Sequence, residues 1–217
     1  MFNQDTFGGA SVTIPLKLDV MPLLNALSPS AKAIGAVNTV VVGTDGYQRI
    51  LCGDNTDWLG ILRPIQRRLT VQNPVALIIG AGGTAMAAAY AMQHLRAELY
   101  IYNRTFTKAE ALAERFNGTA LKEVQLPRID IVIGTIPAGA QTSLPDGLFI
   151  STPIVLDAAY RPAMTPLLLA AQSAGCPCIQ GAEMLYEQAL EQFKLWTKHT
   201  VPPSIMSAIA FASADQS

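Results

Sequence analysis

Residues 75–85 read Val75-Ala76-Leu77-Ile78-Ile79-Gly80-Ala81-Gly82-Gly83-Thr84-Ala85. The first five are all apolar, which is typical of a strand that is buried on both faces of a parallel sheet. The glycines that follow have the spacing G-x-G-x-x-A. This spacing opens a helix and leaves backbone N–H groups free to bind a pyrophosphate. The stretch therefore predicts a strand, a tight turn with a dinucleotide site, and a helix.

Strands and helices continue to alternate beyond this unit. The hydrophobic pattern predicts strands at 98–102, 129–133 and 155–157, and helices at about 83–95, 107–116 and 165–173. Repeated βα units of this kind are typical of an α/β protein with a doubly wound parallel sheet of the Rossmann type. We assign residues 71–183 to this nucleotide-binding domain.

The first seventy residues have a different pattern. We expect a strand at 11–14, a helix at about 16–27, a hairpin of 38–42 and 48–51 that turns at Gly43-Thr44-Asp45-Gly46, and a helix at about 56–69. Two further helices, at about 182–197 and 203–214, have no strand after them. We expect residues 1–70 to form a smaller α/β domain that residues 184–217 complete.

Composition excludes several classes of protein. Half of the 217 residues are hydrophobic and 14% are charged, so the chain is globular. The net charge of −1, without a basic block, argues against direct nucleic-acid binding by this segment. No apolar run approaches the ~18 residues of a membrane span, and the start lacks a secretory signal, so we expect a cytoplasmic protein. Cys52, Cys176 and Cys178 have neither a disulfide-framework nor a zinc spacing, and we expect no metal.

The choice of dinucleotide depends on Asn103-Arg104-Thr105, at the end of the next predicted strand. A site specific for NAD usually has an acidic residue here, which would repel a 2′-phosphate. Arg104 would attract that phosphate and Thr105 could donate a hydrogen bond to it. The sequence therefore favours NADP, with a surface arginine of no special role as the alternative.

Two short motifs contain the residues suited to proton transfer. The first ends in Thr13-Ile14-Pro15-Leu16-Lys17, and the second contains Asn55-Thr56-Asp57-Trp58. A lysine and a carboxylate that converge on a substrate hydroxyl can relay its proton while a cofactor takes the hydride. Beside a dinucleotide site, this predicts an alcohol/ketone oxidoreductase or a descendant of one.

Together these motifs resemble the shikimate dehydrogenase family, and especially the last domain of the fungal pentafunctional arom polypeptide. The resemblance includes the two motifs above, the glycine turn, Gly35-Ala36-Val37-Asn38-Thr39, Asn103-Arg104-Thr105, Ala158-Ala159-Tyr160-Arg161-Pro162, and then Gly181, Met184 and Gln188. It runs from residue 7 to about residue 197 and implies NADP-dependent interconversion of 3-dehydroshikimate and shikimate.

The resemblance also implies roles for single residues. Lys17 and Asp57 would be the catalytic pair. The substrate would be bound by Thr13, Asn38, Asp57, Tyr160 and Gln188. The cofactor would be bound by Gly80, Ala81, Gly82, Gly83, Thr84, Asn103, Arg104, Thr105, Gly181 and Met184.

Two departures from the family pattern matter. Members of the family begin with a segment that this chain lacks, and that segment contributes strands and a Ser-x-Ser motif for the substrate carboxylate. We therefore expect an N-terminally truncated substrate domain. An arginine is also common in the family where Met86 stands, and its loss would weaken cofactor binding.

Three functions remain open at this stage. The first is a shikimate dehydrogenase that is part of a longer polypeptide with upstream domains. The second is a non-catalytic sensor, similar to the fungal quinate-pathway repressor, which would be nuclear. The third is a quinate dehydrogenase, which differs only in its small-molecule substrate.

Overall fold

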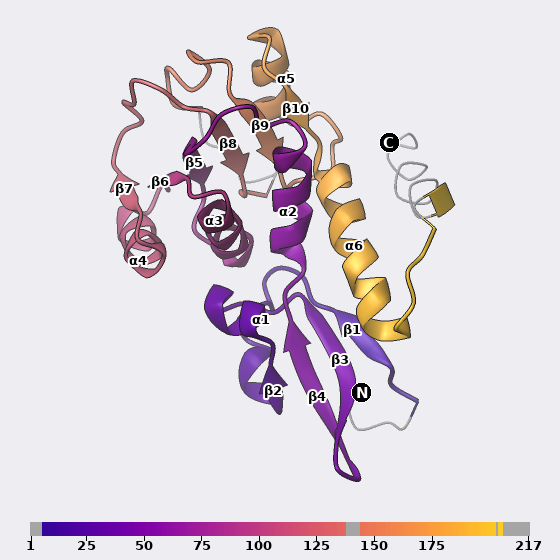
Figure 1. The fold of residues 1–217 in the computed structure, drawn as a ribbon. Coiled ribbons are helices and arrows are strands. Elements are labelled where there is room, and N and C mark those ends of the chain that lie inside the picture. The colour runs from indigo at the N-terminus through magenta and orange to yellow at the C-terminus, as the bar shows by residue number, and fades with distance from the viewer. Residues whose placement is uncertain (1–5, 138–143, 203, 206–217) are drawn as a thin grey trace.

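The computed structural model describes residues 6–137, 144–202 and 204–205, and it contains two separate sheets (Figure 1). The larger sheet has six strands in the order β10-β9-β8-β5-β6-β7, and all neighbours are parallel. Its strands are β5 (Val75–Ile79), β6 (Glu98–Tyr102), β7 (Thr119–Leu121), β8 (Ile131–Gly134), β9 (Ile154–Asp157) and β10 (Cys178–Ile179). The chain winds outward from β5 in both directions, so the predicted doubly wound sheet is confirmed.

Helices cover both faces of this sheet. Ala76 and Ile78 of β5 belong to a core cluster with residues of α3 (Gly83–His94) and α4 (Phe106–Phe116). Leu77 and Ile79 point the other way and pack in a second cluster with α5 (Pro166–Ser173). Burial on both faces explains why β5 is an uninterrupted apolar run.

The smaller sheet has the order β1-β3-β4-β2. Its strands are β1 (Gly9–Ser11), β2 (Ala26–Leu27), β3 (Thr39–Asp45) and β4 (Gln48–Asp54), and only the β2–β4 pair is parallel. A short helix, α1 (Pro29–Ile34), begins where the Ser28 side chain accepts a hydrogen bond from the Ala31 N–H. The sheet and this helix form a separate apolar core around Val37 and Val40.

Two helices lie side by side and connect the sheets (Figure 1): α2 (Asp57–Gln66) and α6 (Gly181–Thr197). They approach closely at Gly60, where an added Cβ would lie 2.6 Å from the carbonyl oxygen of Met184. The indole N–H of Trp196, at the far end of α6, donates to the Val40 carbonyl at 2.9 Å. One helix thus contacts both sheets, and the predicted boundary between residues 183 and 184 falls within its first turn.

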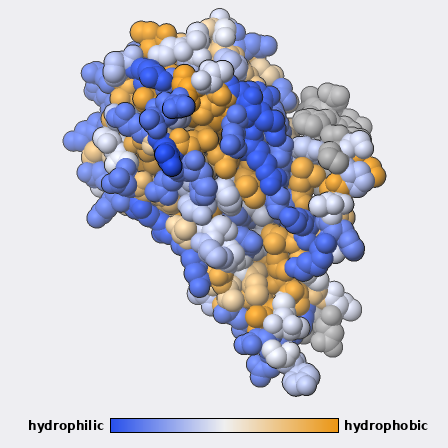
Figure 2. Space-filling view, in the orientation of Figure 1, coloured by the Kyte–Doolittle hydropathy of each residue, from blue (hydrophilic) through white to orange (hydrophobic). Residues whose placement is uncertain are grey.

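Ion pairs reinforce this helix pair. They join three arginines of the α2 region to three glutamates of α6: Arg63, Arg67 and Arg68 with Glu183, Glu187 and Glu191. Figure 2 shows hydrophilic residues in a band over α2 and α6. None of the helices in the described part of the chain is long and apolar enough to cross a membrane.

Some predicted elements differ in the structure. The helix predicted at 16–27 is wrong: turns follow Ile14, a single 3-10 turn spans Met21–Leu23, and β2 begins at Ala26. The strand predicted at 11–14 ends at Ser11. The hairpin strands run further than predicted, so that only Gly46 and Tyr47 separate them. Most of the helix predicted at 203–214 lies outside the described residues.

Candidate active site

A buried ion pair occupies the junction of the two sheets. The Lys17 ammonium donates to Asp57 Oδ2 at 2.5 Å, and only 7% and 4% of the two residues are exposed. Asp57 is the first residue of α2, and its N–H donates to the side chain of Asn55 at 3.0 Å. The carbonyl of Lys17 accepts from the Val37 N–H at 2.8 Å. Backbone contacts therefore fix the positions of both partners.

Asn38 connects this pair to α6. Its side-chain NH₂ donates to Asp57 Oδ1 at 2.9 Å and to Gln188 Oε1 at 2.8 Å. Its side-chain oxygen accepts from the Thr56 N–H at 2.8 Å. Each of these polar groups is buried, and a fixed network of this kind holds donors and acceptors in place for a polar ligand.

A cavity of about 540 Å³ opens beside the network, within the ~300–1,000 Å³ of typical small-molecule sites. All the residues predicted to act on or bind a substrate line it: Thr13, Lys17, Asn38, Asp57, Tyr160 and Gln188. Gly181 and Met184, which were predicted to bind the cofactor, line the same cavity. The structure thus brings together residues from the loops beside both sheets, from α2 and from α6.

A second cavity, of about 390 Å³, adjoins the first at the carboxyl ends of β5 and β6. Its lining includes the other predicted cofactor residues: Gly80, Ala81, Gly82, Gly83, Thr84, Asn103, Arg104 and Thr105. Six residues line both cavities: Ile14, Lys17, Thr84, Thr135, Ile136 and Pro137. The Lys17 ammonium is 3.5 Å from the Thr84 hydroxyl, so the ion pair lies at this common wall.

The second cavity fits a phosphate-bearing dinucleotide. Gly82 is the N-cap of α3 and no side chain caps the helix, so the first N–H groups remain available to an anion. A Cβ at Gly82 would meet no atom within 4 Å, so the backbone is open to close approach there. Gly80 has φ +121°, where a Cβ would lie 2.2 Å from the Thr135 hydroxyl. Arg104 and Lys108 supply positive charge.

Several lining residues were missed from the sequence. Gln192 is one turn beyond Gln188 on α6; it accepts a hydrogen bond from the Ser11 hydroxyl at 3.1 Å and donates to Thr39 at 3.0 Å. The helical spacing of the two glutamines could have indicated it. Lys108 follows Arg104 by four residues, a spacing that could also have been noticed.

Met86 does not line either cavity. It is half-buried and packs against Ile34, Ala36 and Ala87, where α1 meets α3. Its side chain contributes to packing at this junction.

Tyr160 lies in a segment that Asp157, the last residue of β9, holds in place by hydrogen bonds. The buried carboxylate of Asp157 accepts from the Thr165 hydroxyl at 2.6 Å and from the Ala159 N–H at 3.1 Å. Burial raises the pKa of this carboxyl above its ordinary value, and the two hydrogen bonds oppose the shift. Gly181 packs closely against the same segment, because a Cβ at position 181 would lie 2.4 Å from the carbonyl oxygen of Ala159.

A glycine turn at the centre of a doubly wound sheet, next to a buried lysine–aspartate pair, defines the class of dinucleotide-dependent dehydrogenases. Models of three domains match the chain: "Shikimate dehydrogenase substrate binding domain" over residues 1–40, "Shikimate / quinate 5-dehydrogenase" over 65–141, and "Shikimate 5'-dehydrogenase C-terminal domain" over 181–210. The chain belongs to the shikimate dehydrogenase family.

Similar proteins include fungal multidomain enzymes. The chain is 38% identical to the pentafunctional AROM polypeptide of Schizosaccharomyces japonicus in an alignment 231 positions long, which covers 93% of the chain and 14% of the relative. It is 41% identical to that of Malassezia globosa in an alignment 216 positions long, which covers 88% of the chain and 13% of the relative. The chain thus spans about one seventh of the length of these relatives.

Solved structures have the same fold. Shikimate 5-dehydrogenase from Thermus thermophilus, in complex with NADP(H) and shikimate, matches with a TM-score of 0.83 and 32% identity over 96% of this chain and 80% of that one. The dehydroquinate dehydratase and shikimate dehydrogenase from S. pombe AroM matches with a TM-score of 0.77 and 33% identity, over 96% of this chain and 44% of that one.

Proposed function

We propose that this chain is an NADP-dependent shikimate dehydrogenase, which interconverts 3-dehydroshikimate and shikimate as one part of a longer polypeptide. The observation that carries the proposal is the Lys17–Asp57 ion pair, which is buried at the wall between the two cavities, beside the Asn38–Gln188 network and close to the glycine turn. The relatives named above support this choice of substrate and cofactor.

Lys17 and Asp57 move the proton in this proposal. During oxidation, the pair accepts the proton of the reacting hydroxyl; during reduction, the pair returns a proton to the carbonyl oxygen. The 2.5 Å contact lets a proton pass between the ammonium and the carboxylate without solvent. Because Asn38 also binds Asp57 Oδ1, the carboxylate cannot rotate away from the ammonium without breaking a hydrogen bond.

The hydroxyl groups of the substrate are bound by polar side chains around this pair. Asn38 and Gln188 already hydrogen-bond one another at 2.8 Å, and Thr13 and Tyr160 line the same cavity. A buried donor or acceptor that loses its partner costs about 1–3 kcal/mol. The site should therefore bind a ring with several hydroxyl groups more tightly than a ring with fewer.

The cofactor is held in the second cavity, where NADP, when bound, supplies or accepts the hydride. The N–H groups of residues 80–84 bind its pyrophosphate, and Arg104 and Thr105 bind its 2′-phosphate. Gly181 and Met184 line the first cavity and would contact the nicotinamide. In this proposal residues 71–183 form the nucleotide domain, and residues 1–70, completed by the chain from residue 184 on, form the substrate domain.

A second candidate is a quinate dehydrogenase, because one matching domain description covers both substrates, and a quinate dehydrogenase from Corynebacterium glutamicum is 29% identical with a TM-score of 0.81. The test is steady-state formation of NADPH and of NADH with shikimate and with quinate. We expect the highest kcat/KM for NADP with shikimate. Ligand binding without turnover in the complete polypeptide would instead identify a sensor.

A further inference from the structure

Helix α6 is attached to the start of β3, and to the residue before it, by side chains four positions apart. Gln192 donates to the carbonyl of Asn38 at 3.3 Å, and Trp196 donates to the carbonyl of Val40 at 2.9 Å. Four helical residues rise about 6 Å and two strand residues about 6.6 Å, so the spacings of the two elements match. Gln188, one turn before Gln192, accepts from the Asn38 side chain. One stripe of α6 therefore runs along the start of β3 as far as the first cavity.

The backbone fixes the direction of the hydrogen bonds around Gln192. A carbonyl oxygen only accepts, so the part of the Gln192 amide that faces the Asn38 carbonyl is its NH₂ group. The same NH₂ donates to the Thr39 hydroxyl at 3.0 Å. The hydroxyl keeps its own single proton for Asn38 Oδ1, to which it donates at 2.7 Å. Gln192, Thr39 and the Asn38 side chain thus form a chain of hydrogen bonds with one direction.

The end of this chain determines which way the Asn38 amide faces. Asn38 Oδ1 accepts from the Thr39 hydroxyl at 2.7 Å and from the Thr56 N–H at 2.8 Å. These two bonds occupy both lone pairs of the oxygen, so the NH₂ of Asn38 faces Asp57 and Gln188. Hydrogen bonds accepted by an amide oxygen also polarise the amide and strengthen donation by its NH₂.

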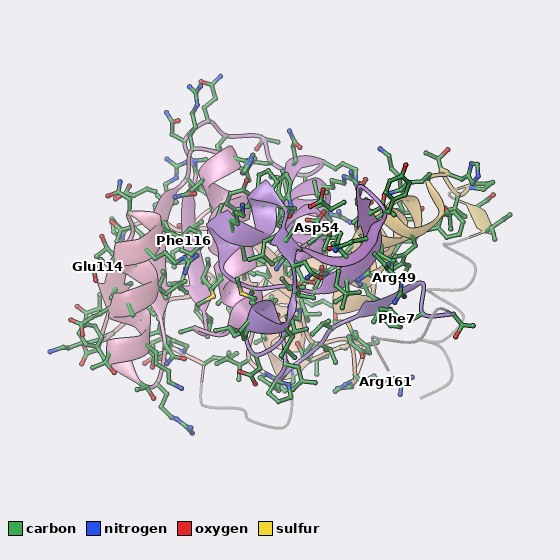
Figure 3. All side chains as sticks on the ribbon, turned by 90° about the horizontal axis from the view of Figure 1, so that it is seen from below. Phe7, Arg49, Asp54, Glu114, Phe116 and Arg161 are labelled. Carbon is green, nitrogen blue, oxygen red and sulfur yellow. The ribbon has the colours of Figure 1, made fainter. Side chains whose placement is uncertain are left out.

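Thr39 lies where solvent does not replace its hydroxyl. Its exposed fraction is 0%. In the smaller sheet it is opposite Asp54 of β4, and Figure 3 shows Asp54 well inside the outline of the molecule in that view. Loss of the Thr39 hydroxyl therefore leaves Asn38 Oδ1 with one partner fewer and without a water in its place.

We propose that Thr39 and Gln192 are positioning residues for the reaction, which fix the orientation of the Asn38 amide. Asn38 in turn holds Asp57 Oδ1 and Gln188 Oε1, and all three of these residues line the first cavity. Thr39 lines neither cavity, so it acts through Asn38. The inference deepens the proposed function and rests on it.

The kinetic test compares Thr39→Val, which keeps the approximate shape and removes the hydroxyl, with Thr39→Ser, which keeps the hydroxyl. With shikimate and NADP, Thr39→Val should lower kcat/KM for shikimate about 10-fold, as expected for loss of one buried hydrogen bond. KM for NADP should change less than about 2-fold, because Thr39 does not line the second cavity. Thr39→Ser should keep kcat/KM for shikimate within about 3-fold of the unmutated chain.

Gln192→Met tests the other end of the chain of hydrogen bonds. It should lower kcat/KM for shikimate about 3- to 10-fold. Combined with Thr39→Val it should cost little more than Thr39→Val alone, because both substitutions interrupt one chain. Gln93→Met is the matched control, because Gln93 is exposed, donates to a backbone carbonyl at 3.2 Å and lines neither cavity. It should leave kcat/KM unchanged.

A second measurement needs no substrate. In ¹⁵N NMR spectra of the ligand-free chain, Thr39→Val should shift the side-chain NH₂ signals of Asn38 and Gln188. Thr39→Ser should leave the Gln188 signals nearly in place, because the hydroxyl still orients the Asn38 amide. If Thr39→Val does not fold, Gln192→Met and its control Gln93→Met decide by the same two readouts.

The outcomes separate this role from packing and from the proposed function. Equal impairment by Thr39→Ser and Thr39→Val, or equal rises in KM for shikimate and for NADP, would overturn the positioning role. Gln188 signals that do not move in Thr39→Val would overturn it as well. An unmutated chain that does not oxidise shikimate would refute the proposed function, while the NMR comparison would still decide the role of Thr39.

Discussion

Asn38 and Gln188 are 150 positions apart in the chain, and their side chains meet in a hydrogen bond of 2.8 Å. Asn38 directly precedes β3 of the smaller sheet, and Gln188 lies on α6. The contact joins two parts of the chain where Asp57 begins α2, so one polar network holds α6 against the smaller sheet and also lines the first cavity.

Replacement of Asn38 should therefore destabilise the protein. Asn38→Leu keeps the approximate size and leaves the buried Thr56 N–H and Asp57 Oδ1 with fewer partners. We expect the free energy of unfolding to fall by about 3 kcal/mol in urea denaturation. Asn25→Leu is the control, since Asn25 makes its hydrogen bond at an exposed site and should change stability by less than about 1 kcal/mol. Equal losses of unfolding free energy in the two variants would show that burial of the network contributes little to stability.

Lys17 should affect turnover more than substrate binding. We expect Lys17→Met to lower kcat for shikimate oxidation about 10²–10⁴-fold, the range for a positioned acid or base, while KM changes far less. Lys32→Met removes an exposed lysine outside both cavities and should leave kcat unchanged. A higher KM with normal kcat would make Lys17 a binding residue instead.

Arg104 should determine the choice of cofactor. Titration calorimetry should give tighter binding of NADP than of NAD, and Arg104→Ala should narrow that difference by about 1–3 kcal/mol through loss of a charged contact to phosphate. Arg96→Ala tests whether any lost positive charge has the same effect. If the unmutated chain binds the two cofactors equally, Arg104 has no part in the discrimination.

Asp157 should give the protein a measurable pH dependence. Because burial raises its pKa in the folded state above the ordinary value of 3.8, the folded state holds more protons than the unfolded one between these two pKa values. Stability from this group is thus complete below the unfolded pKa and is lost as pH rises through the folded pKa. Asp157→Asn should remove that loss. Urea unfolding at several pH values, from about 4 to 7, should show the difference in stability between variant and parent growing with pH. A constant difference would contradict this.

Much of the larger sheet could be predicted from the sequence because its strands have clear apolar patterns. The strands at Val75–Ile79 and Glu98–Tyr102 have the predicted bounds: the first is an apolar run, and the second alternates the buried Leu99 and Ile101 with less buried residues. The segment after Pro15 could not be predicted in this way. Its apolar residues have helical spacing, yet Leu16 and Leu23 are 55% and 63% exposed, and the chain forms turns there. The pattern indicated a buried helical face that the fold does not contain.

The candidate site, too, could be predicted from the sequence only in part. Lys17 and Asp57 stand in short motifs whose chemistry can be read locally, and the structure places them 2.5 Å apart. Ser11 and Gln192 are 181 positions apart and have no local signal that pairs them.

The wall common to both cavities has a thermodynamic consequence. Since Ile14, Lys17, Thr84 and their neighbours line both cavities, a ligand in either one alters the surface that the other ligand meets. The two binding events then form a closed cycle with a single coupling free energy. Whatever factor the nucleotide introduces into the affinity for the acid, the acid must introduce the same factor into the affinity for the nucleotide. Neither dissociation constant is therefore a fixed property of one pocket, and each has a meaning only when the occupancy of the other is stated.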